Sequence, residues 1–190
     1  MSAEAPAGPT LLGRSVRLRP PARAEFQLLF DWYTDPELVA PFDRFFVDTY
    51  DSMEQSIRDA PGDLRSLAPR LVIETAADHH VIGTVGYYLA HPVLTLLDVW
   101  YMLGVPAERG KGYGSEAVAL LVDHLFATQE IDRVGATCDV ENVPSAKLLE
   151  RLGFAREGTL HSALHHHTRW HDVYIYGVTR SAWRSRAVRG

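Results

Sequence analysis

Arg109-Gly110-Lys111-Gly112-Tyr113-Gly114 is the stretch that decides the fold, because it joins an apolar segment to the strongest helical pattern in the chain. Its glycines allow the backbone to approach a ligand closely. The following residues, Gly112 to Thr128, carry apolar side chains at helical spacing. A helix N-terminus offers N–H groups and partial positive charge to a phosphate. The stretch therefore predicts a pyrophosphate-binding loop, with a tight turn and helix cap as the alternative.

This glycine-rich loop differs from the two most familiar nucleotide-binding loops. No lysine followed by serine or threonine comes after its last glycine, and the spacing is not that of a dinucleotide-binding loop. The ligand it predicts is thus a phosphate-bearing molecule of another class.

A second motif begins about thirty residues further on. Asn142-Val143-Pro144-Ser145 opens a predicted helix over Pro144 to Leu152, with proline near its first turn and Gly153 as its stop. This helix follows a predicted strand, Arg133 to Val140.

The rest of the chain alternates between strand and helix patterns. Two of the predicted strands, on either side of the polar turn Ala77 to His80, form a hairpin. With the helices predicted over Ala22–Thr34 and Tyr50–Arg58, the pattern favours an α/β sandwich around a mixed sheet. The other predicted strands are Leu11–Arg19, Arg70–Thr75, Val81–Leu89, Leu94–Val105, Phe154–Leu160 and Val173–Thr179.

These motifs together resemble the GNAT superfamily of acetyltransferases. The resemblance rests on the R-x-x-G-x-G of Arg109 to Gly114, the Ser115-Glu116-Ala117 after it, the N-x-x-S of Asn142 to Ser145 and the L-G-F of Leu152 to Phe154. Leu18-Arg19-Pro20 and Trp170-His171-Asp172 are similar to the ribosomal-protein N-terminal (alanine/serine) acetyltransferase branch. The resemblance implies a mixed, mostly antiparallel central sheet flanked by helices, with a splayed strand pair that forms the acyl-CoA slot.

The resemblance also implies a role for each residue of these motifs. Asn142 would hydrogen-bond the pantetheine or the acceptor side of the slot, and Ser145 would contact the donor and protonate the departing thiolate. The strand segment Leu103, Gly104 and Val105 would bind the pantetheine through its main chain. The implied pyrophosphate contacts are Arg109, Gly110, Lys111, Gly112, Tyr113, Gly114 and Ser115.

A base is needed to deprotonate the acceptor amine, and here the chain departs from the family pattern. Val99 falls where members of the branch often carry a glutamate, so the neighbouring Asp98 is the first candidate. Asp139 and Glu141, at the end of the next strand, are the alternatives. A surface or turn carboxylate is the competing interpretation of each.

Composition limits the class of protein further. The chain has 190 residues, a formal net charge of −5 and one cysteine, Cys138. We expect a single domain over 1–190 with flexible tails at 1–10 and 181–190, a cytoplasmic location, no membrane segment and no nucleic-acid partner. A monomer or a homodimer fits equally well.

Five of the nine histidines lie within the eleven residues from His161 to His171. Strand alternation would let His165 and His167 converge, but zinc needs a further ligand. We therefore predict no metal, and a solvated hairpin or a wall of the substrate site instead.

The predicted function is transfer of an acetyl group from acetyl-CoA to a primary amine, either of a small molecule or of a peptide N-terminus. The attack is direct, without a covalent intermediate. The alternatives are a different donor, such as a longer acyl-CoA or an aminoacyl-tRNA, and a non-catalytic acyl-CoA sensor.

Overall fold

The computed structural model describes residues 8–39, 49–58, 71–91 and 93–186. Its centre is an eight-stranded sheet in the order β1-β2-β3-β4-β5-β6-β8-β7. All neighbouring strands are antiparallel except β5 and β6. The strands are β1 Leu11–Leu12, β2 Val16–Arg19, β3 Leu71–Thr75, β4 Val81–Leu89, β5 Leu97–Leu103, β6 Arg133–Asp139, β7 Ala155–His166 and β8 Arg169–Thr179. The mixed, mostly antiparallel sheet expected from the sequence is confirmed.

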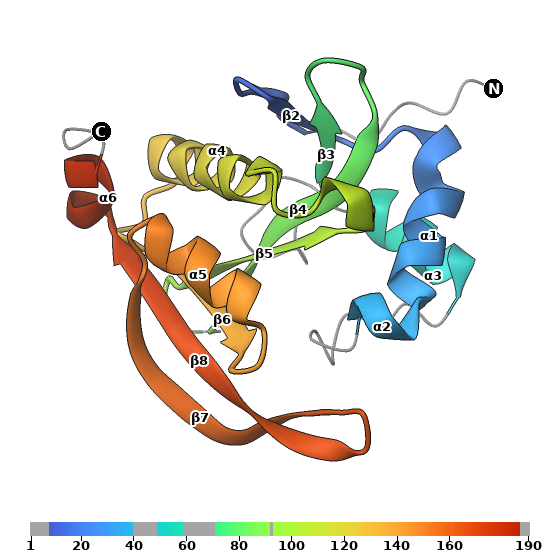
Figure 1. Cartoon of the computed structure of the whole chain (residues 1–190). Helices are drawn as coiled ribbons and strands as arrows, with labels where there is room; N and C mark the ends of the chain where they lie inside the picture. The colour runs from blue at the N-terminus through green and yellow to red at the C-terminus, as the bar shows by residue number, and fades with distance from the viewer. Residues whose placement is uncertain (1–7, 40–48, 59–70, 92, 187–190) are drawn as a thin grey trace.

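Helices cover both faces of this sheet (Figure 1). On one face, α4 and α5 pack with α6 against a core that includes Val99, Leu121 and Leu149. On the other face, α1 and α3 pack against Trp100 and Met102 of β5. The helices are η1 Arg23–Glu25, α1 Phe26–Thr34, α2 Pro36–Val39, α3 Tyr50–Arg58, η3 Pro106–Glu108, α4 Tyr113–Thr128, α5 Val143–Arg151 and α6 Arg180–Arg186.

The predicted first strand, Leu11 to Arg19, is two short strands joined by a turn. The Glu116 carboxylate on α4 accepts hydrogen bonds from the amides of Arg14 and Ser15 and from the Ser15 hydroxyl. These bonds fold the chain back on itself at the turn, a long-range interaction that the local alternation of side chains did not indicate.

The last two strands are much longer than Phe154–Leu160 and Val173–Thr179. They form one curved hairpin that extends beyond the rest of the sheet (Figure 1). Its turn is His167-Thr168, with φ of 48° and 65°. Two successive residues with positive φ are typical of a type I′ turn, which usually contains asparagine or glycine. Because neither residue type is present, no turn is predicted at this position from the sequence.

The tail predicted from residue 181 is wrong for 181–186, which lie in α6. Trp183 of this helix is buried against Phe126 and Phe154, and its indole N–H donates to Asp123 Oδ1 at 2.6 Å. Arg180, the first residue of this helix, donates to the Gln129 and Ile131 carbonyls. The packing partners of Trp183 lie far away in the sequence, so the local pattern did not indicate this helix.

Candidate functional site: a slot between two splayed strands

The slot forms where β5 and β6 separate. The two parallel strands pair only through Leu97 with Val134 and Asp98 with Gly135, although both continue for several residues. Beyond Asp98 their facing edges are free of each other. One pocket runs along this opening, from the glycine-rich loop to the tip of the β7–β8 hairpin. The splayed strand pair expected from the resemblance is confirmed.

The glycine-rich loop lies at one end of this pocket and leads directly into α4. Gly110 and Gly112 have φ of 78° and 92°, a region that side chains other than glycine rarely adopt. A Cβ atom at either position would meet nothing within 4 Å, so the loop is open on the outside. The first N–H groups of α4 have no carbonyl within the helix to bind. This geometry is suited to an anionic ligand.

Three residues at the end of β5 are predicted to bind pantetheine through the main chain: Leu103, Gly104 and Val105. Hydrogen bonds to β4 already engage two of them. The amides of Gly104 and Val105 both donate to the Ile82 carbonyl of β4, at 3.0 and 3.3 Å. Because successive peptide groups of a strand point to opposite edges, Leu103 is the residue whose peptide groups point away from β4. Its carbonyl accepts from the Arg109 guanidinium at 3.0 Å, so the Arg109 side chain holds the loop against the end of β5.

Asn142 is the N-cap of α5. Its Oδ1 accepts the Ser145 amide at 3.2 Å, which explains the spacing of the N-x-x-S motif. The helix ends at Arg151, and Gly153, with φ of 87°, provides the predicted stop. The cap fixes the first turn of α5, and therefore fixes Ser145, beside the slot.

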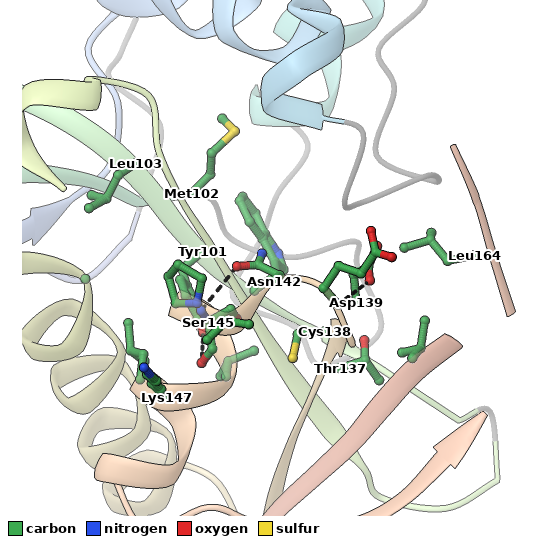
Figure 2. A pocket seen from close by; sticks show the side chains of 18 of the residues that line it. Tyr101, Met102, Leu103, Thr137, Cys138, Asp139, Asn142, Ser145, Lys147 and Leu164 are labelled. Atoms are coloured by element: carbon green, nitrogen blue, oxygen red, sulfur yellow. Dashed lines mark hydrogen bonds between the residues drawn. The ribbon is translucent and has the colours of Figure 1, made fainter. Parts of the chain in front are cut away.

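Ser145 faces Tyr101 of β5 across the slot, with 2.7 Å between the two hydroxyl oxygens (Figure 2). Burial raises the pKa of the Tyr101 phenol, although its hydrogen bond with Ser145 acts in the opposite direction. The hydroxyl pair is neutral, and Ser145 is held in one place. Sequence reasoning missed Tyr101; the signal was a hydroxyl in line with Val99 and Leu103 on the apolar face of β5.

Asp98 lines the same pocket, but at the end where β5 and β6 are still paired. Alternation along β5 puts it on the face of Trp100 and Met102, opposite to Tyr101. Burial raises the pKa of its carboxyl, and the positive charge of Arg133 only partly offsets this effect. A raised pKa is suitable for a base, although the structure does not bring Asp98 together with Ser145.

The two alternative bases are engaged with other side chains. Asp139 is buried and lies 2.6 Å from His166, while Glu141 forms an ion pair with Arg169 at 2.6 Å. Burial raises the pKa of Cys138, beside Asp139, to about 11, which disfavours the thiolate that a nucleophilic cysteine needs.

The histidine-rich hairpin is arranged differently from the prediction. His167 lies in the turn, and the His165 ring lies beside that of Trp170, with centroids 5.1 Å apart and a tilt of 56°. The residues that converge are His166 and His171, whose rings stack with centroids 3.7 Å apart. They line the pocket at the end opposite to the glycine-rich loop.

Comparison with known proteins decides the family. The model of the acetyltransferase (GNAT) domain matches residues 15–155, which include the splayed strands, the glycine-rich loop and the α5 motif. The chain belongs to the GNAT acetyltransferase family. The GNAT match extends from β2 to the first residue of β7, so it covers both splayed strands and the two helices beside them but not the β7–β8 hairpin.

Individual N-acetyltransferases are also similar to this chain over most of its length. An uncharacterized N-acetyltransferase of Bacillus licheniformis, p20, is 31% identical over 176 residues, which are 90% of this chain and 96% of that protein. The spermidine N-acetyltransferase of Vibrio cholerae, solved with CoA and spermine, superposes with a TM-score of 0.78 at 19% identity, covering 90% of this chain and 98% of that one. The ribosomal-protein-S5-alanine acetyltransferase of Vibrio fischeri gives a TM-score of 0.74 at 23% identity, covering 93% and 99%.

The family match and the p20 relative support acyl transfer as the general activity. In the described part of the chain, no helix combines the length and apolarity needed to cross a membrane.

Proposed function

We propose that this chain is a single-domain cytoplasmic enzyme that transfers the acetyl group of acetyl-CoA to a primary amine. The observation that carries the proposal is the Tyr101–Ser145 hydroxyl pair, which lies in the opening between β5 and β6. The pair lies between a loop suited to a pyrophosphate and a pocket wall rich in titratable groups.

In this proposal the donor binds from the side of α4. The first N–H groups of α4 and the open loop at Gly110 and Gly112 would receive the pyrophosphate, assisted by the exposed Lys111. The Leu103 amide, which points away from β4, would pair with the pantetheine arm. The thioester would then enter the opening beside Ser145.

The neutral amine attacks the thioester carbonyl carbon, and the carbon–sulfur bond breaks when the tetrahedral intermediate collapses. The amine nitrogen loses a proton to a base, and the sulfur gains one from the Ser145 hydroxyl, which takes a proton back from water. Tyr101 acts through Ser145, so it is a positioning residue. An α-amino group, with a pKa of about 7.7 to 8.0, is a better acceptor than a lysine side chain near about 10.4, because more of it is neutral at physiological pH.

Asp98 remains our first candidate for the base. Its raised pKa brings the carboxylate nearer to the pH at which it can accept a proton from an amine. Its position on the face opposite to Tyr101 would require a water molecule to relay the proton.

The first test is calorimetric titration with acetyl-CoA. The native protein should bind one equivalent, and Gly112→Val combined with Gly114→Val should abolish binding. The first change strains a positive-φ position, and the second places a side chain against Leu148, 3.3 Å from a Cβ at Gly114.

Gly153→Val is the matched control, because it introduces the same kind of backbone strain at φ of 87° with open space around it. It should bind acetyl-CoA like the native protein. A screen of amines with detection of released thiol then tests turnover. Absence of binding by the native protein contradicts the donor assignment, and binding without thiol release from any amine contradicts catalysis.

A further inference from the structure

Three side chains with metal-binding atoms meet where the end of β6 faces the tip of the β7–β8 hairpin. Asp139 Oδ2 lies 2.6 Å from His166 Nε2 and 3.1 Å from His171 Nδ1. Among the described residues, these three bring one donor atom each to within 4.8 Å of one another. The imidazole rings of His166 and His171 stack at 3.7 Å and 21°. Both rings thus direct a nitrogen at one carboxylate oxygen.

The hairpin register brings the two histidines together. His166 pairs with Arg169, and Leu164 pairs with His171, so all four side chains lie on one face. Next to them, the pair of His165 and Trp170 lies on the other face. The two-residue turn fixes this register. Residues five apart in the sequence are therefore diagonal neighbours that face the end of β6.

His171 is a buried polar side chain without a hydrogen bond. The side chain is 2% exposed, and neither ring nitrogen has a hydrogen-bond partner in the described part of the chain. Nδ1 is close to Asp139, but the pair is outside hydrogen-bonding geometry. Buried polar groups of this kind are rare in native proteins and require an explanation. A cation held by the Nδ1 lone pair would give that nitrogen a partner.

Neighbouring residues orient the donor atoms of Asp139 and His166, as the residues around metal ligands do in metal sites. Asp139 Oδ1 accepts the Glu141 amide at 2.7 Å, which leaves Oδ2 for the histidines. The other nitrogen of His166, Nδ1, lies 2.8 Å from His167 Nδ1, and His167 Nε2 lies 3.5 Å from Glu37. Metal-binding histidines generally have their second nitrogen held in this way.

We propose that Asp139, His166 and His171 bind one divalent transition-metal ion, with Zn²⁺ as the best match to two imidazoles and a carboxylate. Tetrahedral zinc with bonds of about 2.0 to 2.2 Å has donor atoms about 3.3 to 3.6 Å apart. The donor pairs at 2.6 and 3.1 Å reach this spacing with small side-chain movements. The three residues also line the pocket that runs along the slot. The proposal does not depend on acetyl transfer.

The experiment uses the full chain without a polyhistidine tag, freed of metal by a chelator and then titrated with Co²⁺ and, separately, with Zn²⁺. We expect one ion per chain and the visible absorption bands of four- or five-coordinate Co²⁺. His166→Asn and Asp139→Asn should each weaken binding by at least about 100-fold, because each removes one of three ligands. His165→Asn, on the opposite face of the same strand, should bind like the native protein.

His166 is the principal test position because it lies at the rim of the cluster, whereas a change at buried His171 also disturbs packing. Circular dichroism and thermal unfolding verify that each variant is folded. The proposal is overturned if the native protein binds neither ion at one equivalent, if the His166 and Asp139 variants bind like the native protein, or if His165→Asn is equally impaired. Acetyl-CoA titration of the same metal-free samples tests the proposed function separately, since the donor site shares no residue with the metal site.

Discussion

At the scale of single residues, Ser145 depends on two others for its place in the slot. Asn142 caps α5 and so fixes the turn that carries Ser145, and Tyr101 holds the Ser145 hydroxyl from across the opening. The N-x-x-S spacing is therefore explained by the helix cap. Its chemical consequence is that the Ser145 hydroxyl has a defined position.

We expect Ser145→Ala to lower the turnover number for thiol release by about 100-fold or more, the usual contribution of a general acid. Tyr101→Phe should cause a smaller loss, because it acts only through Ser145. Acetyl-CoA binding, measured by calorimetry, should be unchanged in both. Ser185→Ala, on α6, is the control and should have full activity. A Ser145→Ala enzyme with native turnover would refute the assignment of Ser145 as the acid.

At the scale of elements, the slot exists because β5 and β6 have different partners. β5 is held by β4 along its whole length, whereas β6 is held by β8. Each strand thus follows its antiparallel neighbour, and the parallel pair between them separates after two residue pairs. Helices α4 and α5 begin on either side of the opening, which explains why both motifs lie at helix N-termini.

The docking of α6 provides a prediction at this scale. Trp183→Ala removes a buried aromatic ring that packs on Phe126 and Phe154. We expect a loss of about 3 to 5 kcal/mol in the free energy of unfolding, measured with urea. Exposed Arg184→Ala, the next residue of the same helix, should change it by less than about 0.5 kcal/mol. Equal stability of the Trp183 variant and the native protein would mean that α6 does not dock in solution.

At the scale of the whole molecule, Glu74 joins segments that are far apart in the sequence. Its buried carboxylate contacts Arg17 and Arg19 of β2 and His79 of the β3–β4 turn. Arg19 extends the network to Glu25 beside α1. Burial raises the pKa of Glu74, but its hydrogen bonds to Arg17, Arg19 and His79 more than offset this, and the pKa lies below its ordinary value.

A lowered pKa in the folded state means that the unfolded chain binds more protons in acid. The contribution of Glu74 to stability is therefore complete above the ordinary glutamate pKa, about 4.3, and is lost as the pH falls through the lower folded-state value. Glu74→Gln should cost about 3 kcal/mol near neutral pH, because it removes one partner of a buried ion pair. The difference from the native protein should shrink in acid. Urea unfolding as a function of pH measures both effects.

Glu157→Gln is the control for the charge change. Glu157 pairs with Arg133 but its side chain is 43% exposed, so its removal should cost at most about 1 kcal/mol. A Glu74→Gln difference that does not vary with pH would contradict an electrostatic origin of the stabilisation by Glu74.

The sequence by itself determined the family and the order of most elements, and it predicted the glycine-rich loop and the motif at the start of α5. Glycines at positive φ, an N-cap three residues before a serine and helical apolar spacing are local features, so they can be recognised in a short stretch of chain. Features that depend on residues far away in the sequence were not predictable in this way. They are the turn held by Glu116, the length of the final hairpin and the docking of Trp183.

Only the tertiary structure decided which polar side chains meet. Tyr101 reaches Ser145 because β5 and β6 separate, and the hairpin register, not sequence proximity, selects His166 and His171 to face Asp139. Spacing within one strand pointed to His165 and His167 instead. The physical reason is that a site assembled across several strands depends on their pairing and divergence, which are set by packing and hydrogen bonding over the whole sheet.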